Sequence, residues 1–246
     1  MMIDGTALVT GGSSGIGAAV ADGLAAAGCR LVVLGRDRDR LDAVAGRTGA
    51  RAVVADLCTA DGLVRAAQVA ADVDLLVNSA GLGWAGDLAA MAEPDIDALV
   101  ALNLTAPMRL TRAALPGMRA RGRGQLVYVS SIAAVGVSGE SVYAATKAGL
   151  RAFADSVRLE VAGEGIGVTT VLPGAVRTPF FDHRGLPYDR RFPRQLDPAD
   201  VASALLEALE RNDPEVFVPR WLTVAARVRG AAPALFHHLS HRFGGA

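Results

Sequence analysis

Tyr143 and Lys147 are the residues whose types and spacing in this sequence best fit a chemical role. They stand four residues apart in an alanine-rich segment, and at that spacing two helix side chains project from one face and can act on one site. A free tyrosine has a pKa of about 10, which suits neutral pH poorly, and a nearby ammonium lowers that pKa by favouring the phenolate. The pair therefore predicts a phenol that exchanges a proton with a reacting oxygen.

Lysine usage strengthens this interpretation. Lys147 is the only lysine among 25 lysine and arginine residues. A flexible ammonium differs in shape from a rigid guanidinium, so a chain that otherwise uses arginine has lysine where this chemistry requires it. An arbitrary Tyr-x-x-x-Lys on a helix is more often a pair of solvated surface residues, and the rest of the sequence must decide between the two.

A glycine-rich turn, Thr10–Gly17, supplies that context. It follows an apolar run and opens a helical pattern, so its glycines would let the backbone approach an anion closely while free N–H groups at the helix start bind it. In the first crossover of a parallel sheet, this arrangement predicts a site for the pyrophosphate of a dinucleotide.

The elements that must position these residues alternate along the chain. Short, wholly apolar runs are predicted as strands buried on both faces of a sheet, at 7–10, 31–34, 52–55, 74–78, 126–129, 168–172 and 216–218. Helical patterns separate them, at 16–27, 39–47, 60–71, 96–119, 142–163 and 198–211. This alternation predicts an α/β fold, a doubly wound Rossmann-type parallel sheet of about seven strands with helices on both faces.

Two segments depart from the alternation. Residues 177–197 contain Pro179, Gly185, Pro187 and Pro193 and are predicted to form an irregular lid-like loop. Residues 219–246 are predicted to be an extra helical tail. Since no linker or repeat interrupts the pattern, we expect one domain over residues 1–246.

Bulk composition excludes several classes of protein. The chain has 246 residues and a formal net charge of zero, which gives no sign of nucleic-acid binding. Two cysteines, Cys29 and Cys58, make neither a disulfide framework nor a zinc site. Residues 1–10 do not resemble a signal peptide, and no run of about 18 apolar residues could span a membrane. We expect a cytoplasmic protein without a transmembrane segment.

The glycine spacing, Gly-x-x-x-Gly-x-Gly, resembles that of the short-chain dehydrogenase/reductase family in its compact single-domain branch. The resemblance extends from about Ala7 to Val218. It includes Asp56 at the end of the third strand, the stretch Asn78–Gly81 in place of the family's Asn-Asn-Ala-Gly, and Asn103 in the long fourth-region helix. It also includes Pro173–Thr178, which is similar to the segment that binds the nicotinamide carboxamide.

The resemblance implies a nicotinamide cofactor and hydride transfer to a ketone or aldehyde, or from a secondary alcohol. It implies catalytic roles for Ser131, Tyr143, Lys147 and Asn103, with Asn103 on a water-linked proton path. The expected cofactor-binding residues are Gly11, Ser13, Ser14, Gly15, Ile16, Gly17, Arg36, Asp56, Leu57, Asn78, Ala80, Gly81, Tyr143, Lys147, Pro173, Gly174, Val176 and Thr178.

Ser130 and Ser131 compete for the role of the hydroxyl that bonds the substrate oxygen and stabilises developing charge. The motif Ser-Ser-x-Ala matches Ser131, whereas the family's usual distance to the tyrosine falls on Ser130. We favour Ser131, because strand ends align better than loops.

Cofactor choice depends on the residues after the second strand. An acidic side chain at the strand end would bind the ribose hydroxyls of NAD and repel a 2′-phosphate, but this chain has Gly35 and Arg36 there. Asp37, and Ser14 at a position where many NADP-dependent relatives have a base, weaken the case. We expect NADP(H) in preference to NAD(H).

Substrate and partners are less constrained. The stretch Pro214–Trp221 looks more like the ending of reductases of lipophilic substrates than that of 3-oxoacyl reductases, so a lipophilic substrate is expected and a 3-oxoacyl reductase is the alternative within enzymes. The loop at 177–194 has five arginines and four aromatic residues, and could clamp an anionic or a lipophilic substrate. A non-catalytic dinucleotide-binding regulator is the alternative outside enzymes.

The last two predictions concern the oligomeric state and the C-terminal tail. The resemblance implies a homodimer or homotetramer. The tail has His237, His238 and His241 without carboxylate or thiol partners, and we expect no metal there. Its arginines and apolar residues favour a helix packed on the protein over one that touches a membrane surface.

Overall fold

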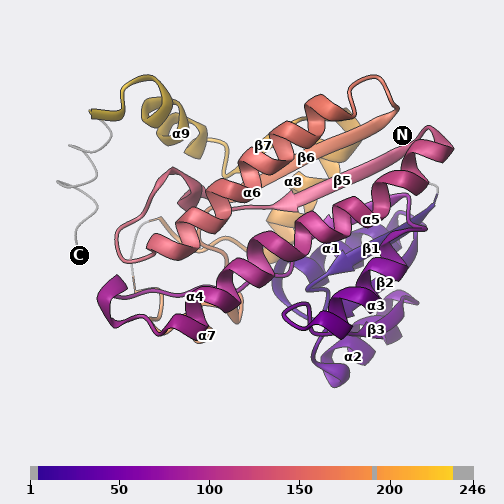
Figure 1. The fold of residues 1–246 in the computed structure, drawn as a ribbon, viewed down its shortest axis with the longest axis horizontal. Helices are drawn as coiled ribbons and strands as arrows, with labels where there is room; N and C mark the ends of the chain where they lie inside the picture. The colour runs from indigo at the N-terminus through magenta and orange to yellow at the C-terminus, as the bar shows by residue number, and fades with distance from the viewer. Residues whose placement is uncertain (1–4, 190–192, 235–246) are drawn as a thin grey trace.

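The computed structural model describes residues 5–189 and 193–234, which form one seven-stranded parallel sheet between two layers of helices (Figure 1). The strand order is β3-β2-β1-β4-β5-β6-β7. The chain starts with β1 inside the sheet and adds β2 and β3 towards one edge, then returns beside β1 with β4 and adds β5, β6 and β7 towards the other edge. The order reverses between β1 and β4, and the carboxyl ends of the strands flank a crevice there, where ligands bind in open α/β sheets.

All seven predicted strands are present, with ends within two residues of those expected. They are β1 (Thr6–Thr10), β2 (Arg30–Gly35), β3 (Arg51–Val54), β4 (Leu75–Asn78), β5 (Gly124–Val129), β6 (Ile166–Pro173) and β7 (Glu215–Val218). Each pairs in parallel with its neighbour, which confirms the predicted fold class.

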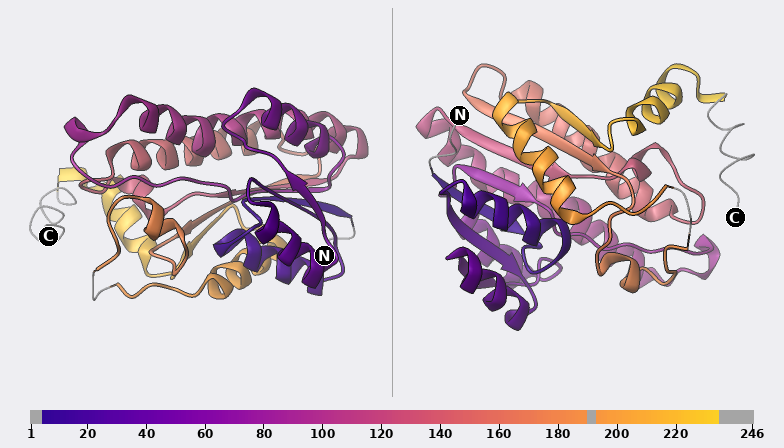
Figure 2. Two further views of the ribbon diagram at one scale, coloured as in Figure 1. Left: turned by 90° about the horizontal axis from the view of Figure 1, so that it is seen from below. Right: turned by 180° about the vertical axis from the view of Figure 1, so that it is seen from behind.

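Helices cover both faces of the sheet (Figure 2). One layer holds α1 (Gly15–Ala26), α2 (Arg38–Thr48) and α8 (Pro198–Arg211), and the other holds α3 (Ala60–Ala70), α5 (Ala106–Arg121) and α6 (Ser141–Glu160). Three shorter helices, α4 (Glu93–Val100), α7 (Phe180–His183) and α9 (Leu222–Ala231), lie beyond the carboxyl ends of the strands (Figure 1).

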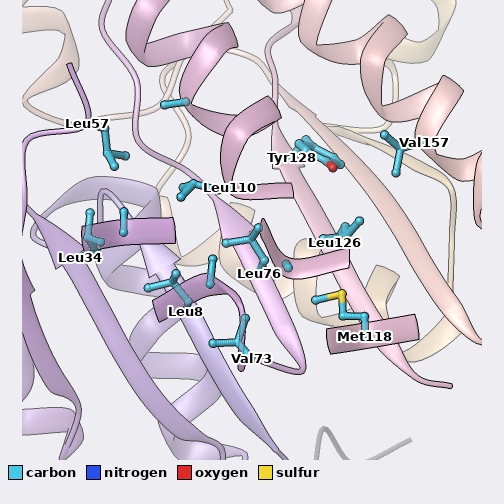
Figure 3. Close-up of a cluster of buried hydrophobic side chains, with 14 of the residues drawn as sticks. Leu8, Leu34, Leu57, Val73, Leu76, Leu110, Met118, Leu126, Tyr128 and Val157 are labelled. Carbon is cyan, nitrogen blue, oxygen red and sulfur yellow. The ribbon is translucent and has the colours of Figure 1, made fainter. Parts of the chain in front are cut away.

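Two apolar cores explain why the strands are apolar throughout. Successive strand residues point to opposite faces, so Leu8 and Leu76 pack against α3, α5 and α6, while Val9 and Val77 pack against α1, α2 and α8. Figure 3 shows the first core, where the Tyr128 hydroxyl is satisfied by Thr111 at 2.8 Å. Both faces of the sheet are therefore filled, and ligands can enter only at the strand ends.

The single helix predicted for residues 96–119 was wrong in one respect. The chain forms α4, then a π-helical turn at Ala101–Thr105, and then α5. A π-turn accommodates one extra residue in the helix, and such turns occur frequently at functional sites. Asn103 lies in this turn and is fully buried.

One of the two irregular segments contains more structure than expected, and the other begins with a helix, as predicted. The loop predicted at 177–197 includes α7, and the tail after β7 begins with α9, whose Leu222 is buried. The histidines at 237, 238 and 241 lie outside the described residues.

Candidate active site

One cavity of about 620 Å³ runs along the carboxyl ends of the strands, from the end of β2 to α7. It brings together predicted residues from seven separate segments of the chain. Those that line it are Gly11, Ser13, Ser14, Ile16, Gly17, Arg36, Asp56, Leu57, Ala80, Gly81, Ser131, Tyr143, Lys147, Pro173, Gly174, Val176 and Thr178.

Gly15, Asn78 and Asn103 do not line it. Gly15 lies against Thr178, whose methyl group would be 2.9 Å from an added Cβ. Asn78 is buried beneath the cavity floor, where its amide donates to the Val127 carbonyl at 3.3 Å. These three residues therefore support the residues of the cavity wall and do not themselves face the cavity.

The start of α1 is built to receive an anion. The side chain of its N-cap residue, Ser14, makes no capping hydrogen bond, and the first turn has no acidic residue. In contrast, Asp37, Thr59 and Asp197 cap α2, α3 and α8 with their side chains. The free N–H groups and the positive end of the helix dipole at α1 therefore fit a pyrophosphate.

Two glycines allow this approach. Gly17 packs so tightly that an added Cβ would lie 2.3 Å from the Gly11 carbonyl oxygen. Gly11 itself has a φ of +66° and lies against the Ala80 backbone. Only glycine fits both positions, so the residues present match the requirements of a dinucleotide.

At the end of the cavity next to β2 and β3, two arginines and two aspartates line the wall, and both aspartates already accept hydrogen bonds from the chain. Asp37 accepts a hydrogen bond from the Arg40 backbone at 3.0 Å and pairs with the Arg40 guanidinium at 3.2 Å. Asp56 accepts from the backbone N–H of Cys58 at 2.9 Å. Arg36 and Arg40 both line the cavity, and Arg40 was not anticipated, although it stands one turn after Arg36.

Tyr143 and Ser131 face each other near the middle of the cavity. Ser131 caps a short 3-10 turn at Ile132–Val135 by accepting from the Ala133 N–H at 3.1 Å, and its hydroxyl lies near enough to the Tyr143 phenol to lower the pKa of that phenol. Ser130 points elsewhere, since it donates to the Lys147 carbonyl at 2.9 Å. The geometry therefore favours Ser131 as the partner of Tyr143.

The pKa of the Tyr143 phenol moves in the opposite direction from the one we predicted. Burial raises it above its ordinary value, and this outweighs the lowering effect of the nearby Ser131 hydroxyl. Lys147 does not offset the burial in this state of the site, because its Nζ donates to the Val129 carbonyl at 2.9 Å and lies 5.8 Å from the centre of the Tyr143 ring.

Lys147 is buried, and this burial lowers the pKa of its ammonium to about 8. The group lies close to Gly81, where an added Cβ would be 3.4 Å from Nζ and 3.3 Å from the Asn103 amide oxygen. A glycine at 81 therefore keeps the space above Lys147 open.

Asn103 connects two segments of the chain that form the site. Its side chain accepts from the Leu82 N–H at 2.8 Å, and donates to the Leu82 carbonyl at 2.9 Å and to Thr146 at 3.1 Å. These bonds tie the loop after β4 to α6. This arrangement shows how Asn103 positions the site, and the catalytic role that the family resemblance implies for it stays a prediction.

The far end of the cavity is an apolar chamber. Its wall contains Ile132, Val137, Phe180, Phe181, Tyr188 and Leu222. The Phe180 ring lies 5.4 Å from that of Tyr143, so the chamber adjoins the phenol. Glu140 and Arg184 form an ion pair in this chamber, which no motif in the sequence indicates.

No group of three or more metal-ligating side chains occurs among residues 5–189 and 193–234. Within the same described ranges, no helix has both the length and the apolarity needed to cross a membrane.

Comparisons with known proteins agree with this geometry. A family model described as short chain dehydrogenase matches residues 5–187. A short-chain type dehydrogenase/reductase of Sinorhizobium fredii is 41% identical over 175 residues, which is 70% of each chain.

Two solved structures are similar over nearly their whole length. A short-chain dehydrogenase from Sphingobium yanoikuyae in complex with NADPH has a TM-score of 0.83 and 32% identity, and the match covers 92% of this chain and 94% of that one. The bulky-bulky ketone specific alcohol dehydrogenase from Comamonas testosteroni has a TM-score of 0.81 and 30% identity, with 93% of each chain covered.

The chain therefore belongs to the short-chain dehydrogenase/reductase family. It is an oxidoreductase that uses a nicotinamide dinucleotide and acts on a ketone or alcohol.

Proposed function

We propose that this enzyme reduces bulky, uncharged, apolar ketones or aldehydes with NADPH, or oxidises the corresponding secondary alcohols with NADP⁺. The observation that carries the proposal is the position of Tyr143. Its phenol lies beside Ser131, between the glycine-lined cleft and the apolar chamber, and all of these line one continuous cavity. A carbonyl group held there would have its carbon within reach of a nicotinamide and its oxygen within reach of the phenol.

Three side chains of the site would each have a separate role in the reaction. The bound dinucleotide supplies the hydride. Ser131 donates a hydrogen bond to the carbonyl oxygen and stabilises the charge that develops on it. Tyr143 gives its proton to the same oxygen, which leaves an alcohol and a phenolate. The ammonium of Lys147, which lies on the same helix, stabilises that phenolate once it faces the reaction centre.

Three features support NADP(H) over NAD(H). Arg36 and Arg40 line the cleft beyond β2, and the carboxylate of Asp37 is already occupied by the start of α2 and by Arg40. A 2′-phosphate would therefore meet guanidinium groups. The Sphingobium relative, which was solved with NADPH, agrees with this proposal.

The chamber supports a bulky apolar substrate. Its wall is mostly aromatic and aliphatic, and the charges of Glu140 and Arg184 neutralise one another. The Comamonas relative is named for bulky-bulky ketones, which are the substrates such a chamber would hold.

The test is the rate of NADPH and NADH oxidation with a ketone series of increasing apolar bulk, from acetone to phenyl ketones with two large substituents. We expect kcat/KM to rise with bulk and to be at least tenfold higher with NADPH. Arg36→Ala should remove most of the NADPH advantage, whereas Arg38→Ala, an exposed residue outside the cavity, should retain it. Equal rates with both cofactors in the wild type would contradict the NADP assignment.

A further inference from the structure

The Glu140–Arg184 ion pair is the most deeply buried ion pair found among residues 5–189 and 193–234. The side chains are 17% and 12% exposed, and both line the chamber. An ion pair removed from water is costly unless both partners are well satisfied, and a buried charge that loses its partner costs several kcal/mol. Its presence at the substrate end of the cavity therefore calls for an explanation.

Arg184 is held firmly in place by other contacts as well. Its guanidinium lies over the Phe181 ring at 4.7 Å, and its Nε donates to the Leu186 carbonyl at 2.8 Å. Its own carbonyl accepts from the Ala85 N–H at 2.9 Å. If the carboxylate of Glu140 were removed, these contacts would keep the guanidinium in the chamber wall.

Glu140 connects the wall to the reaction centre. It is the N-cap residue of α6, three residues before Tyr143, but its side chain makes no capping bond and is directed to Arg184 instead. The preceding Gly139 carbonyl accepts from the Gly86 N–H at 2.8 Å, which fixes this turn against the loop after β4. The ion pair is therefore a fixed part of the chamber.

The electrostatic effects on Tyr143 show that both charges reach the site. After burial and the nearby Ser131 hydroxyl, Glu140 raises the pKa of the phenol and Arg184 lowers it. A substrate next to Tyr143 would feel the same two opposing charges. The other charged side chains at this end of the cavity, among the described residues, are His183 and Asp189, which are exposed at the rim, and Lys147 below Tyr143.

We infer that Glu140 and Arg184 determine the charge specificity of the enzyme: Glu140 occupies the guanidinium that would otherwise bind an anionic substrate. This inference deepens the proposed function and rests on it for the turnover part of the test. With Glu140 in place, a substrate carboxylate would have to displace the carboxylate of Glu140 from Arg184. The displaced carboxylate would then be left unpaired. Without its charge, Arg184 becomes a subsite for a carboxylate or another small anion.

The test compares a phenyl keto acid with its methyl ester, which has the same skeleton without the charge. The wild type should prefer the ester. Glu140→Gln keeps the size of the side chain and one oxygen that can accept from Arg184 but removes the charge, and it should raise the acid-to-ester ratio of kcat/KM by tenfold or more. The double variant Glu140→Gln/Arg184→Gln should return the ratio to the wild-type value, since the guanidinium is then absent.

Glu215→Gln is the matched control, because Glu215 pairs with Arg151 at 2.6 Å outside this cavity, and the ratio should not change there. A Glu140→Gln enzyme that turns over the ester but keeps the wild-type ratio would overturn the inference. If the wild type turns over neither compound with either cofactor, the proposed function fails instead.

A second measurement separates the two failures, because it requires no turnover. Benzoate and benzamide are titrated into the wild type and Glu140→Gln by calorimetry. We expect benzoate to bind at least tenfold more tightly to Glu140→Gln than to the wild type, with benzamide unchanged. Equal benzoate affinity, or an equal change for both compounds, would show that the ion pair only supports the fold of the chamber.

Discussion

At the scale of single residues, the site combines a proton donor and a cation that the protein buries at a cost. Lys147 lies beneath Gly81, with its Nζ bonded to the Val129 carbonyl, and burial lowers the pKa of its ammonium to about 8. A group whose pKa falls below its unfolded value on folding opposes folding while it is charged in both states. The buried ammonium of Lys147 therefore lowers the stability of the folded protein, and its position is explained by its role in the reaction.

Lys147→Met should stabilise the protein without cofactor while it abolishes turnover. The shift from 10.5 to about 8 corresponds to at most about 3 kcal/mol at pH 7. Above pH 8 the folded wild type releases this proton while the unfolded chain keeps it up to about pH 10.5, so the wild type gains stability as the pH rises.

Urea unfolding of both proteins at pH 7 and pH 9.5 measures this. The advantage of Lys147→Met should shrink at the higher pH. A variant less stable than the wild type at pH 7 would show that the hydrogen bond to Val129 outweighs the burial of the charge.

The residues that act together through close spacing in the sequence were predictable. The residues that only the fold brings together were not. Tyr143 and Lys147 are four apart on one helix, and the glycine turn is continuous in the chain. Glu140 and Arg184 are separated by 44 residues, and only the packing of α7 brings them together. The pKa of Tyr143 was misjudged for the same reason, because burial depends on the whole fold and outweighs a neighbour on the same helix.

At the scale of elements, the start of α1 and the break between α4 and α5 position the site. The glycine turn was predictable, because strand, turn and helix follow each other without interruption. The π-turn was not predicted, although residues 96–119 contain a signal for a break: Pro107, at the start of α5, has no N–H to donate to the carbonyl four residues earlier. It is stabilised by bonds from Asn103 to Leu82 and Thr146, which are distant in sequence.

Gly17→Ala tests the close packing at the start of α1. Its Cβ would lie 2.3 Å from the backbone oxygen of Gly11, which has no room to move. We expect a loss of about 1–3 kcal/mol in the free energy of unfolding and at least tenfold weaker NADPH binding.

Gly46→Ala is the control, since Gly46 lies inside α2 with nothing within 4 Å of an added Cβ. It should gain about 0.5–1 kcal/mol and leave NADPH binding unchanged. Unfolding and NADPH fluorescence titrations measure both variants. Unaltered NADPH affinity in Gly17→Ala would contradict the pyrophosphate site.

At the scale of the whole molecule, the order of apolar strands and amphipathic helices determines a sheet covered on both faces. Because the strands are mostly buried, their sequences are mostly apolar, and this pattern made all seven strands predictable from the amino-acid sequence alone. The chamber was less predictable. Its wall comes from α7, α9 and the segments around 132–140, and their meeting depends on how the ends of the fold pack.

We expect the enzyme to form a homodimer or homotetramer through α5 and α6, as the family resemblance implies. Leu159 on α6 is 79% exposed, an apolar side chain that a partner subunit could cover. Light scattering coupled to gel filtration should give a mass two or four times that of the chain. A monomer at micromolar concentration would reject this expectation.

The most direct test of the account is a comparison of the wild type with Tyr143→Phe in two assays, NADPH binding by fluorescence and NADPH oxidation with a phenyl ketone. Phenylalanine keeps the ring against Phe180 and removes only the hydroxyl that lies beside Ser131. We expect NADPH affinity within about threefold of the wild type and turnover reduced by at least a thousandfold, a loss of about 4 kcal/mol in transition-state stabilisation. Turnover within tenfold of the wild type would show that Tyr143 is not the proton donor and would contradict the proposed mechanism.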